Sequence, residues 1–229
     1  MTSEDRLLPH AGVRQRGPAP TGTRLLLVRH GESHANARGV AGGPIGDGGL
    51  TDLGRRQARA LAERLALSRE LAGTHALYTS TLPRAIETGE LLASGLPGHL
   101  SPVRDEGLNE VNVGDGDGLT WAEFEARFGI TDWSVEPHKP NAPGGESLIA
   151  FYDRCEATLN ALAQRHPGEL VICVCHGGVI EQAMKIWLGV GATTRLQPRI
   201  ENCSMTEFEV RDSGWRLLRY NDLAPLPAE

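Results

Sequence analysis

The sequence predicts an α/β protein in which helices cover both faces of a mostly parallel central sheet, a three-layer α/β/α sandwich. Short apolar runs alternate along the chain with longer stretches whose apolar residues recur every three or four positions. Two of the runs, Leu25–Val28 and Leu170–Cys175, are hydrophobic throughout, which is typical of strands buried on both faces of a parallel sheet. A chain of 229 residues is long enough to bury the core of one such domain.

Each element has its own local signal. The apolar runs predict strands at 24–28, 76–78 and 170–175, with a further strand at 100–104. Residues 206–210 and 215–220 predict a closing pair of strands around the turn at 212–214. The helical patterns predict helices after Thr51 as far as Leu65, and at 83–93, 121–128, 148–162 and 179–188. Residues 105–120 are rich in Gly and Asp and predict a loop. Residues 1–22 lack periodicity, so we expect a flexible N-terminal arm before a single domain over 23–229.

Charge and composition exclude several classes of partner. The net charge of −6 argues against a nucleic-acid-binding surface, which normally carries a basic excess. No apolar run approaches the roughly 20 residues that a membrane-spanning helix needs. Residues 1–23 have no apolar segment of the kind found in signal peptides. We therefore expect a cytoplasmic protein without nucleic-acid or membrane partners.

The four cysteines match no disulfide framework. Cys173 and Cys175 precede His176, which leaves a zinc site open as an alternative. However, no second ligand pair follows at a suitable spacing, and the surrounding residues read as a buried strand. The sequence therefore favours buried thiols and no metal.

Histidines and arginines follow three of the predicted strands. Arg29 and His30 come after the first strand, His176 comes after the strand 170–175, and Arg84 lies shortly after 76–78. Ligands of open α/β sheets bind beyond the carboxyl ends of the strands. We therefore expect these side chains to meet at one end of the sheet. Arginine forks match phosphoryl oxygens, and a neutral imidazole can attack phosphorus. Each of these side chains therefore has a task if the ligand is a phosphate ester.

A leaving alkoxide would need a proton from a nearby acid, and Glu110 is our candidate. The same polar loop holds other carboxylates that leave this assignment open. They are Asp105, Glu106, Asp115 and Asp117.

Five stretches carry these residues in order along the chain. They are Arg29–Ser33 followed by Asn36, then Leu50–Ala58, Thr79–Thr88, Leu108–Thr120 and Val174–Ile180. Together they resemble the histidine phosphatase superfamily, in its branch 1 with phosphoglycerate mutase-like proteins. The resemblance covers residues 24 to about 220 and implies the phosphoglycerate mutase-like α/β/α fold.

The resemblance implies a role for each matched position. His30 would be the nucleophile that becomes phosphohistidine, and Glu110 would protonate the leaving group and then activate water. Arg29, Arg84 and His176 would bind the phosphoryl oxygens. Further phosphate contacts would come from Asn36, Gly42, Gly43 and Gly177. Neither metal nor cofactor is implied, because these side chains supply the positive charge.

The implied reaction is hydrolysis of a small phosphorylated metabolite by a metal-independent phosphatase. Two alternatives stay open: a cofactor-dependent phosphoglycerate mutase, and a phosphate-binding or regulatory module that acts on phosphoproteins. The stretch from Thr120 to Pro143 is too short for the insertion that such mutases carry, which favours hydrolysis. Glu146 and His138 are further candidates for contacting substrate. The sequence identifies neither the substrate nor whether the protein forms a homodimer.

One position departs from the family pattern. Gly116 stands where many relatives have an aromatic residue.

Overall fold

The computed structural model describes residues 22–98 and 100–224. The predicted arm, apart from Gly22, lies outside these residues. Within them a six-stranded sheet has the order β3-β2-β4-β1-β5-β6. The strands are β1 (Thr23–Arg29), β2 (Thr74–Thr79), β3 (Val103–Arg104), β4 (Leu170–Cys175), β5 (Met205–Arg211) and β6 (Gly214–Asp222). The helices are α1 (His34–Arg38), α2 (Asp52–Ser68), α3 (Pro83–Ala93), α4 (Trp121–Phe128), α5 (Leu148–Arg165) and α6 (Gly177–Trp187), with 3₁₀ turns η1 (Glu106–Leu108) and η2 (Gly114–Gly116).

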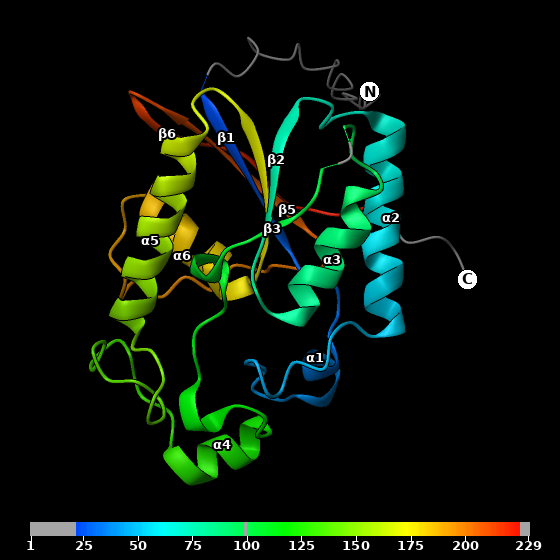
Figure 1. The fold of residues 1–229 in the computed structure, drawn as a ribbon. Coiled ribbons are helices and arrows are strands. Elements are labelled where there is room, and N and C mark those ends of the chain that lie inside the picture. Colours follow the sequence, from blue (N-terminus) through cyan, green and yellow to red (C-terminus); the bar gives the residue numbers. More distant parts are fainter. Residues whose placement is uncertain (1–21, 99, 225–229) are drawn as a thin grey trace, which may run out of the picture.

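Helices cover both faces of the sheet, which confirms the predicted three-layer architecture. Helices α2 and α3 lie on one face, and α5 and α6 lie on the other (Figure 1). The pairings β3–β2, β2–β4 and β4–β1 are parallel. β5 runs antiparallel to β1, and β6 forms a hairpin with β5, so the sheet is mixed at one edge.

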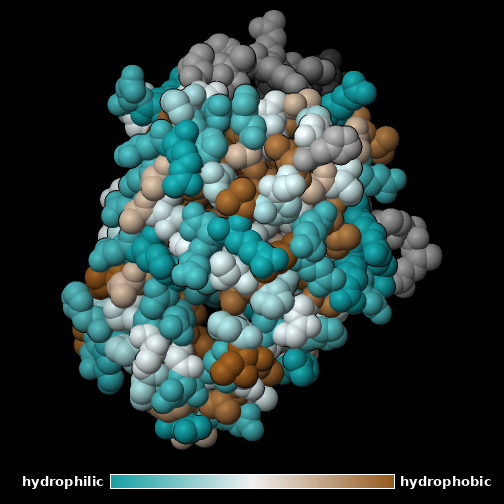
Figure 2. Space-filling model, in the orientation of Figure 1, coloured by the Kyte–Doolittle hydropathy of each residue, from teal (hydrophilic) through white to brown (hydrophobic). Residues whose placement is uncertain are grey.

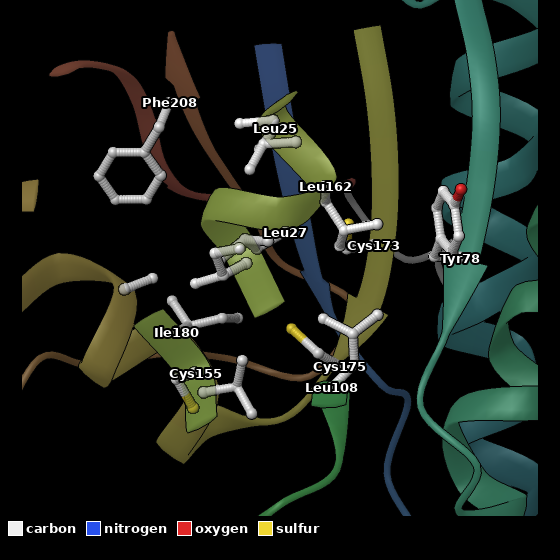
Figure 3. Close-up of a cluster of buried hydrophobic side chains, with 14 of the residues drawn as sticks. Leu25, Leu27, Tyr78, Leu108, Cys155, Leu162, Cys173, Cys175, Ile180 and Phe208 are labelled. Carbon is white, nitrogen blue, oxygen red and sulfur yellow. The ribbon is translucent and has the colours of Figure 1, made fainter. Parts of the chain in front are cut away.

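Alternate residues of the central strands supply two separate cores. On β1, Leu25 and Leu27 face α5 and α6, whereas Leu26 and Val28 face α2 and α3. β4 is buried along its whole length and alternates in the same way. Figure 3 shows the core on the α5 and α6 side, where Leu25, Leu27 and the thiols of β4 converge. Burial on both faces explains why these strands read as continuous apolar runs.

Local capping sets the beginnings of the long helices. Thr51 precedes α2 and accepts a hydrogen bond from the backbone N–H of Gly54. Ser147 does the same for α5 through the N–H of Ala150. Both hydroxyls satisfy a backbone donor that has no partner inside its own helix.

Two elements differ from the sequence expectation. The strand predicted at 100–104 is reduced to Val103 and Arg104, both exposed at the sheet edge, where packing adds little. The five-residue helix α1 was not predicted, because it is too short to show an apolar period. A capping box holds α1, with Ser33 and Asn36 each bonding the other's backbone N–H.

The segment around α4 has a small core of its own. Phe124 is fully buried there beside Ala41 and Ala142. A Cβ at Gly116 would lie 2.0 Å from the Phe124 ring, so this ring occupies the space that a larger residue at 116 would need. α1 and α4 both lie at the end of the sheet toward which β1 and β4 run (Figure 1). Within residues 22–98 and 100–224, no helix has the length and apolar character needed to cross a bilayer.

Candidate active site

A cavity of about 850 Å³ opens at the carboxyl ends of β1 and β4. Four of the predicted catalytic residues line it, namely Arg29, His30, Arg84 and Glu110. Arg29 is the last residue of β1 and His30 follows it, whereas Arg84 lies in the first turn of α3 after β2. Strand ends thus bring together side chains that are far apart in the sequence.

His30 forms part of the cavity wall with both ring nitrogens engaged. Its Nδ1 lies 2.7 Å from the carbonyl oxygen of Gly31, which fixes the proton on Nδ1. Its Nε2 accepts a hydrogen bond of 3.1 Å from Nε of Arg84. Burial, reinforced by the charges of Arg84 and Arg29, holds the pKa of His30 well below its ordinary value. The result is a neutral imidazole whose Nε2 lone pair is available for nucleophilic attack.

Arg84 is held in place by a buried carboxylate. Asp47 is fully buried and lies 2.9 Å from Nη1 of Arg84. The same nitrogen donates to the carbonyl of Gly42, and Asp47 also accepts from the backbone N–H of Gly49. The guanidinium is therefore locked, which leaves its Nε directed at His30.

His176 is fully buried and is not among the residues that line the cavity, but the centre of its ring lies 5.1 Å from that of His30. Burial first, and then the nearby positive charges led by Arg84, hold the pKa of His176 well below its ordinary value. Its Nε2 lies 2.7 Å from Oγ of Ser80, which is also 2.8 Å from Oδ1 of Asn109. The single hydroxyl proton can serve only one of these acceptors. When it is donated to His176, Nδ1 carries the imidazole proton.

Two buried nitrogens in this group have no hydrogen-bond partner among the described residues. They are Nδ1 of His176 and Nε of Arg29. Nη1 of Arg29, in contrast, donates to the carbonyl of Ile200. Buried polar atoms are nearly always paired in native proteins, so these two mark a place for an acceptor-rich ligand.

Glu110 approaches the same group from the loop after η1. Its carboxylate accepts hydrogen bonds of 3.0 Å from the backbone N–H groups of Val111 and Gly178. Two other acidic residues of this loop have different tasks: Asp105 accepts from Gly107 N–H, and Asp117 accepts from three N–H groups of the glycine-rich loop. Among the acidic residues of 105–120, Glu110 alone lines the cavity with His30.

The remaining predicted contacts divide into two groups. Asn36, Gly42 and Gly177 line the cavity. Gly43, Glu146 and His138 are not brought to it. The N–H of Gly43 is taken by Asp117. Glu146 forms a two-bond ion pair with Arg154, which lowers the pKa of Glu146 against its burial, and His138 is exposed on an outer loop.

Sequence reasoning missed three residues that position the site: Asp47, Ser80 and Asn109. Weak signals for two of them exist. Asp47 is the lone charged residue in the glycine-rich stretch 39–49, and Ser80 belongs to the Thr79–Thr88 motif. Nothing in the sequence connects Asn109 with His176.

The cysteines take no part in this site. All four are free and buried, and burial raises the pKa of the Cys203 thiol to about 12. Figure 3 shows Cys173 and Cys175 packed in the apolar core. No cluster of three potential metal-ligating side chains occurs in the described part of the chain, so the zinc alternative gains no support.

Comparison with known proteins places this geometry in a family. The model of the histidine phosphatase superfamily (branch 1) matches residues 25–223. The chain is 34% identical to phosphoglycerate mutase-like protein 4 of Arabidopsis thaliana over 88% of this chain and 86% of the relative. It is 33% identical to the metal-independent phosphoserine phosphatase of the same plant, covering 89% and 83%.

A solved structure agrees with these relatives. The mycobacterial glucosyl-3-phosphoglycerate phosphatase superposes with a TM-score of 0.72 at 27% identity, covering 87% of this chain and 99% of that one. The chain therefore belongs to the histidine phosphatase superfamily, branch 1, as its five ordered motifs suggest.

Proposed function

We propose that this protein is a phosphatase that hydrolyses small phosphate monoesters through a phosphohistidine on His30. One observation carries the proposal: a buried, neutral imidazole presents its Nε2 to a cavity between two arginines. Two relatives named above are phosphatases of phosphorylated small molecules, which supports the same reaction class.

In the first step, Nε2 of His30 attacks phosphorus as the bond to the leaving oxygen breaks. Arg84 and Arg29 bind the equatorial oxygens, where charge develops in the transition state. The hydrogen bond from Arg84 to Nε2 passes to a phosphoryl oxygen, which frees the lone pair. Glu110 gives a proton to the leaving oxygen, so the alcohol departs neutral.

In the second step, water attacks the phosphorus of the phosphohistidine. Glu110 takes the proton of that water as the new P–O bond forms, and the P–N bond breaks to restore His30. Nδ1 of His176 donates to the phosphoryl group when Ser80 donates to Nε2 of the same ring.

Hydrolysis is favoured over a mutase by the charges along the cavity. Besides Arg29 and Arg84, its basic lining residues are Lys185 and Arg195. Each is paired with a carboxylate, Lys185 with Glu181 and Arg195 with Asp132. This pairing is poorly suited to retaining a second phosphate group while water is excluded. Stimulation of phosphoglycerate interconversion by 2,3-bisphosphoglycerate would instead favour the mutase.

The decisive test is phosphate release from 4-nitrophenyl phosphate. His30→Ala should lower kcat/KM by roughly 10⁴-fold, because the nucleophile is lost. His34→Ala is the matched control, since His34 is exposed on α1 and lies outside the cavity lining. Brief mixing of wild type with ³²P-labelled substrate should also leave an acid-labile, base-stable label. Unchanged turnover by His30→Ala would refute the mechanism, whereas an absence of turnover by wild type would favour the phosphate-binding alternative.

A further inference from the structure

The cavity continues beyond the catalytic group along one face of α6. Gly178, Glu181, Gln182 and Lys185 all line it, and their spacing of three or four residues places them on one side of the helix. At about 1.5 Å per residue, Glu181 lies roughly 6 Å and Lys185 roughly 12 Å along the axis from Gly177. This polar face of α6 therefore runs away from the phosphate-binding end.

The polar face of α6 has hydrogen-bonding capacity that the protein leaves unused. Lys185 is 4% exposed, and its ammonium contacts Oε1 of Glu181 at 2.9 Å and the carbonyl of Ala192 at 3.2 Å. Because an ammonium has three donors, one has no partner among the described residues. Gln182 is 3% exposed, and its Oε1 likewise has no partner there. A buried amide oxygen without a donor indicates a ligand that supplies one.

Much of the remaining cavity wall is apolar. It includes Val111, Leu148 and Phe151 from the body of the protein, and Trp121 and Trp133 from the segment around α4. The face of the molecule drawn in Figure 2 is mostly hydrophilic, and the places where hydrophobic residues reach it include the end where α4 lies. A cavity of about 850 Å³ with such walls is much larger than a phosphate group needs.

We propose that the polar face of α6 binds the zwitterionic head of an amino acid carried by the leaving group. The carboxylate accepts from Lys185, and the ammonium donates to Oε1 of Gln182 and to Glu181. Lys185 supplies one cation, Glu181 one anion and Oε1 of Gln182 one unpaired acceptor. Together they match the carboxylate and the ammonium of such a head. The length of α6 between the two ends requires an apolar spacer between the head and the phosphoester. This inference rests on the proposed phosphatase function and adds its substrate class.

Four aryl phosphates with one common scaffold test the proposal. They are O-phospho-L-tyrosine, its ammonium-only analogue tyramine phosphate, its carboxylate-only analogue 3-(4-phosphonooxyphenyl)propanoate, and 4-ethylphenyl phosphate, which has neither charge. Each charged group should raise kcat/KM by about tenfold over 4-ethylphenyl phosphate, as a buried hydrogen bond to a charged group does. O-phospho-L-serine should show a smaller preference over ethyl phosphate, because it lacks the spacer.

Variants assign each preference to its residue. Lys185→Met should abolish the carboxylate preference and keep that for ammonium, whereas Gln182→Leu should weaken the ammonium preference. Lys139→Met is the matched control, since Lys139 is the other lysine of the chain, is exposed, and lies outside the cavity lining. A merely structural role for Lys185 would change kcat/KM for all four phosphates alike.

The outcomes separate the two proposals. If none of the phosphates is hydrolysed by wild type, the phosphatase function itself fails. If all four are hydrolysed with equal kcat/KM, the phosphatase stands and the head-group site is refuted. The proposed ammonium contact would be overturned if wild type and Gln182→Leu showed an equal preference for ammonium. This holds even where Lys185→Met has the expected effect.

Discussion

The two ends of the cavity are built in different ways. At the catalytic end, strand termini hold buried groups in fixed contacts, such as His30 with Gly31 and Arg84 with Asp47. At the far end, the loops after α4 and α6 meet through an exposed ion pair between Asp132 and Arg195.

The contrast indicates where chemistry and selectivity reside. Buried contacts near β1 and β4 define positions to within hydrogen-bond tolerance, as phosphoryl transfer requires. Exposed loops tolerate substitution, so they can adapt to different leaving groups without disturbing the reacting atoms. We therefore expect substitutions at the two ends to have very unequal effects.

Apart from loss of the nucleophile itself, the largest effect is expected from Asp47→Asn. Removing the carboxylate leaves the buried guanidinium of Arg84 uncompensated, which costs about 3–5 kcal/mol for a buried ion pair. Activity on 4-nitrophenyl phosphate should fall at least tenfold as Arg84 loses its orientation. Chemical denaturation measures the loss of stability, and steady-state kinetics measure the loss of activity. Asp52→Asn is the control, because Asp52 on α2 forms an exposed ion pair. An equal loss of stability and activity in that variant would contradict the expected difference between buried and exposed contacts.

A change of pH is expected to have an intermediate effect, which acts on the free energy of unfolding. Because the folded-state pKa of His30 is depressed, the unfolded chain binds more protons below about pH 6.5. Stability from this histidine is therefore present above pH 6.5 and is lost as pH falls toward the folded-state pKa. His30→Gln removes this dependence, so wild type should lose about 1.4 kcal/mol relative to the variant between pH 7.5 and 5.5.

Urea denaturation at both pH values gives that difference directly. His176→Gln should behave in the same way, because burial and the same arginines depress the pKa of His176. A wild-type-to-variant difference that does not change with pH would show that these histidines are not held neutral by the site.

The smallest effect is expected from Arg195→Ala. The side chains of Arg195 and Asp132 are 73% and 53% exposed, and such pairs contribute less than about 1 kcal/mol to stability. Thermal melting should barely change, and kcat/KM for 4-nitrophenyl phosphate should stay within about twofold. A larger loss of kcat/KM would show that closure of these loops contributes to the chemical step.

The sequence predicted most of the fold because its strands are buried on both faces. Continuous apolar runs such as Leu25–Val28 cannot belong to an exposed edge, and helical periods fix the layers around them. β3 was predicted too long because edge strands carry little hydrophobic signal. α1 was missed because five residues show no period.

The sequence by itself determined which groups we propose as the reacting ones: His30, Arg29, Arg84 and Glu110 follow from residue type, strand ends and motif order. The tertiary structure decided how those groups are held. It pairs Asp47 with Arg84 across 37 positions and brings Asn109 to Ser80 across 29. It also joined the polar face of α6 to the catalytic cavity. The physical reason is that helical and strand periods record burial along one element, whereas contacts between elements depend on packing that no local pattern encodes.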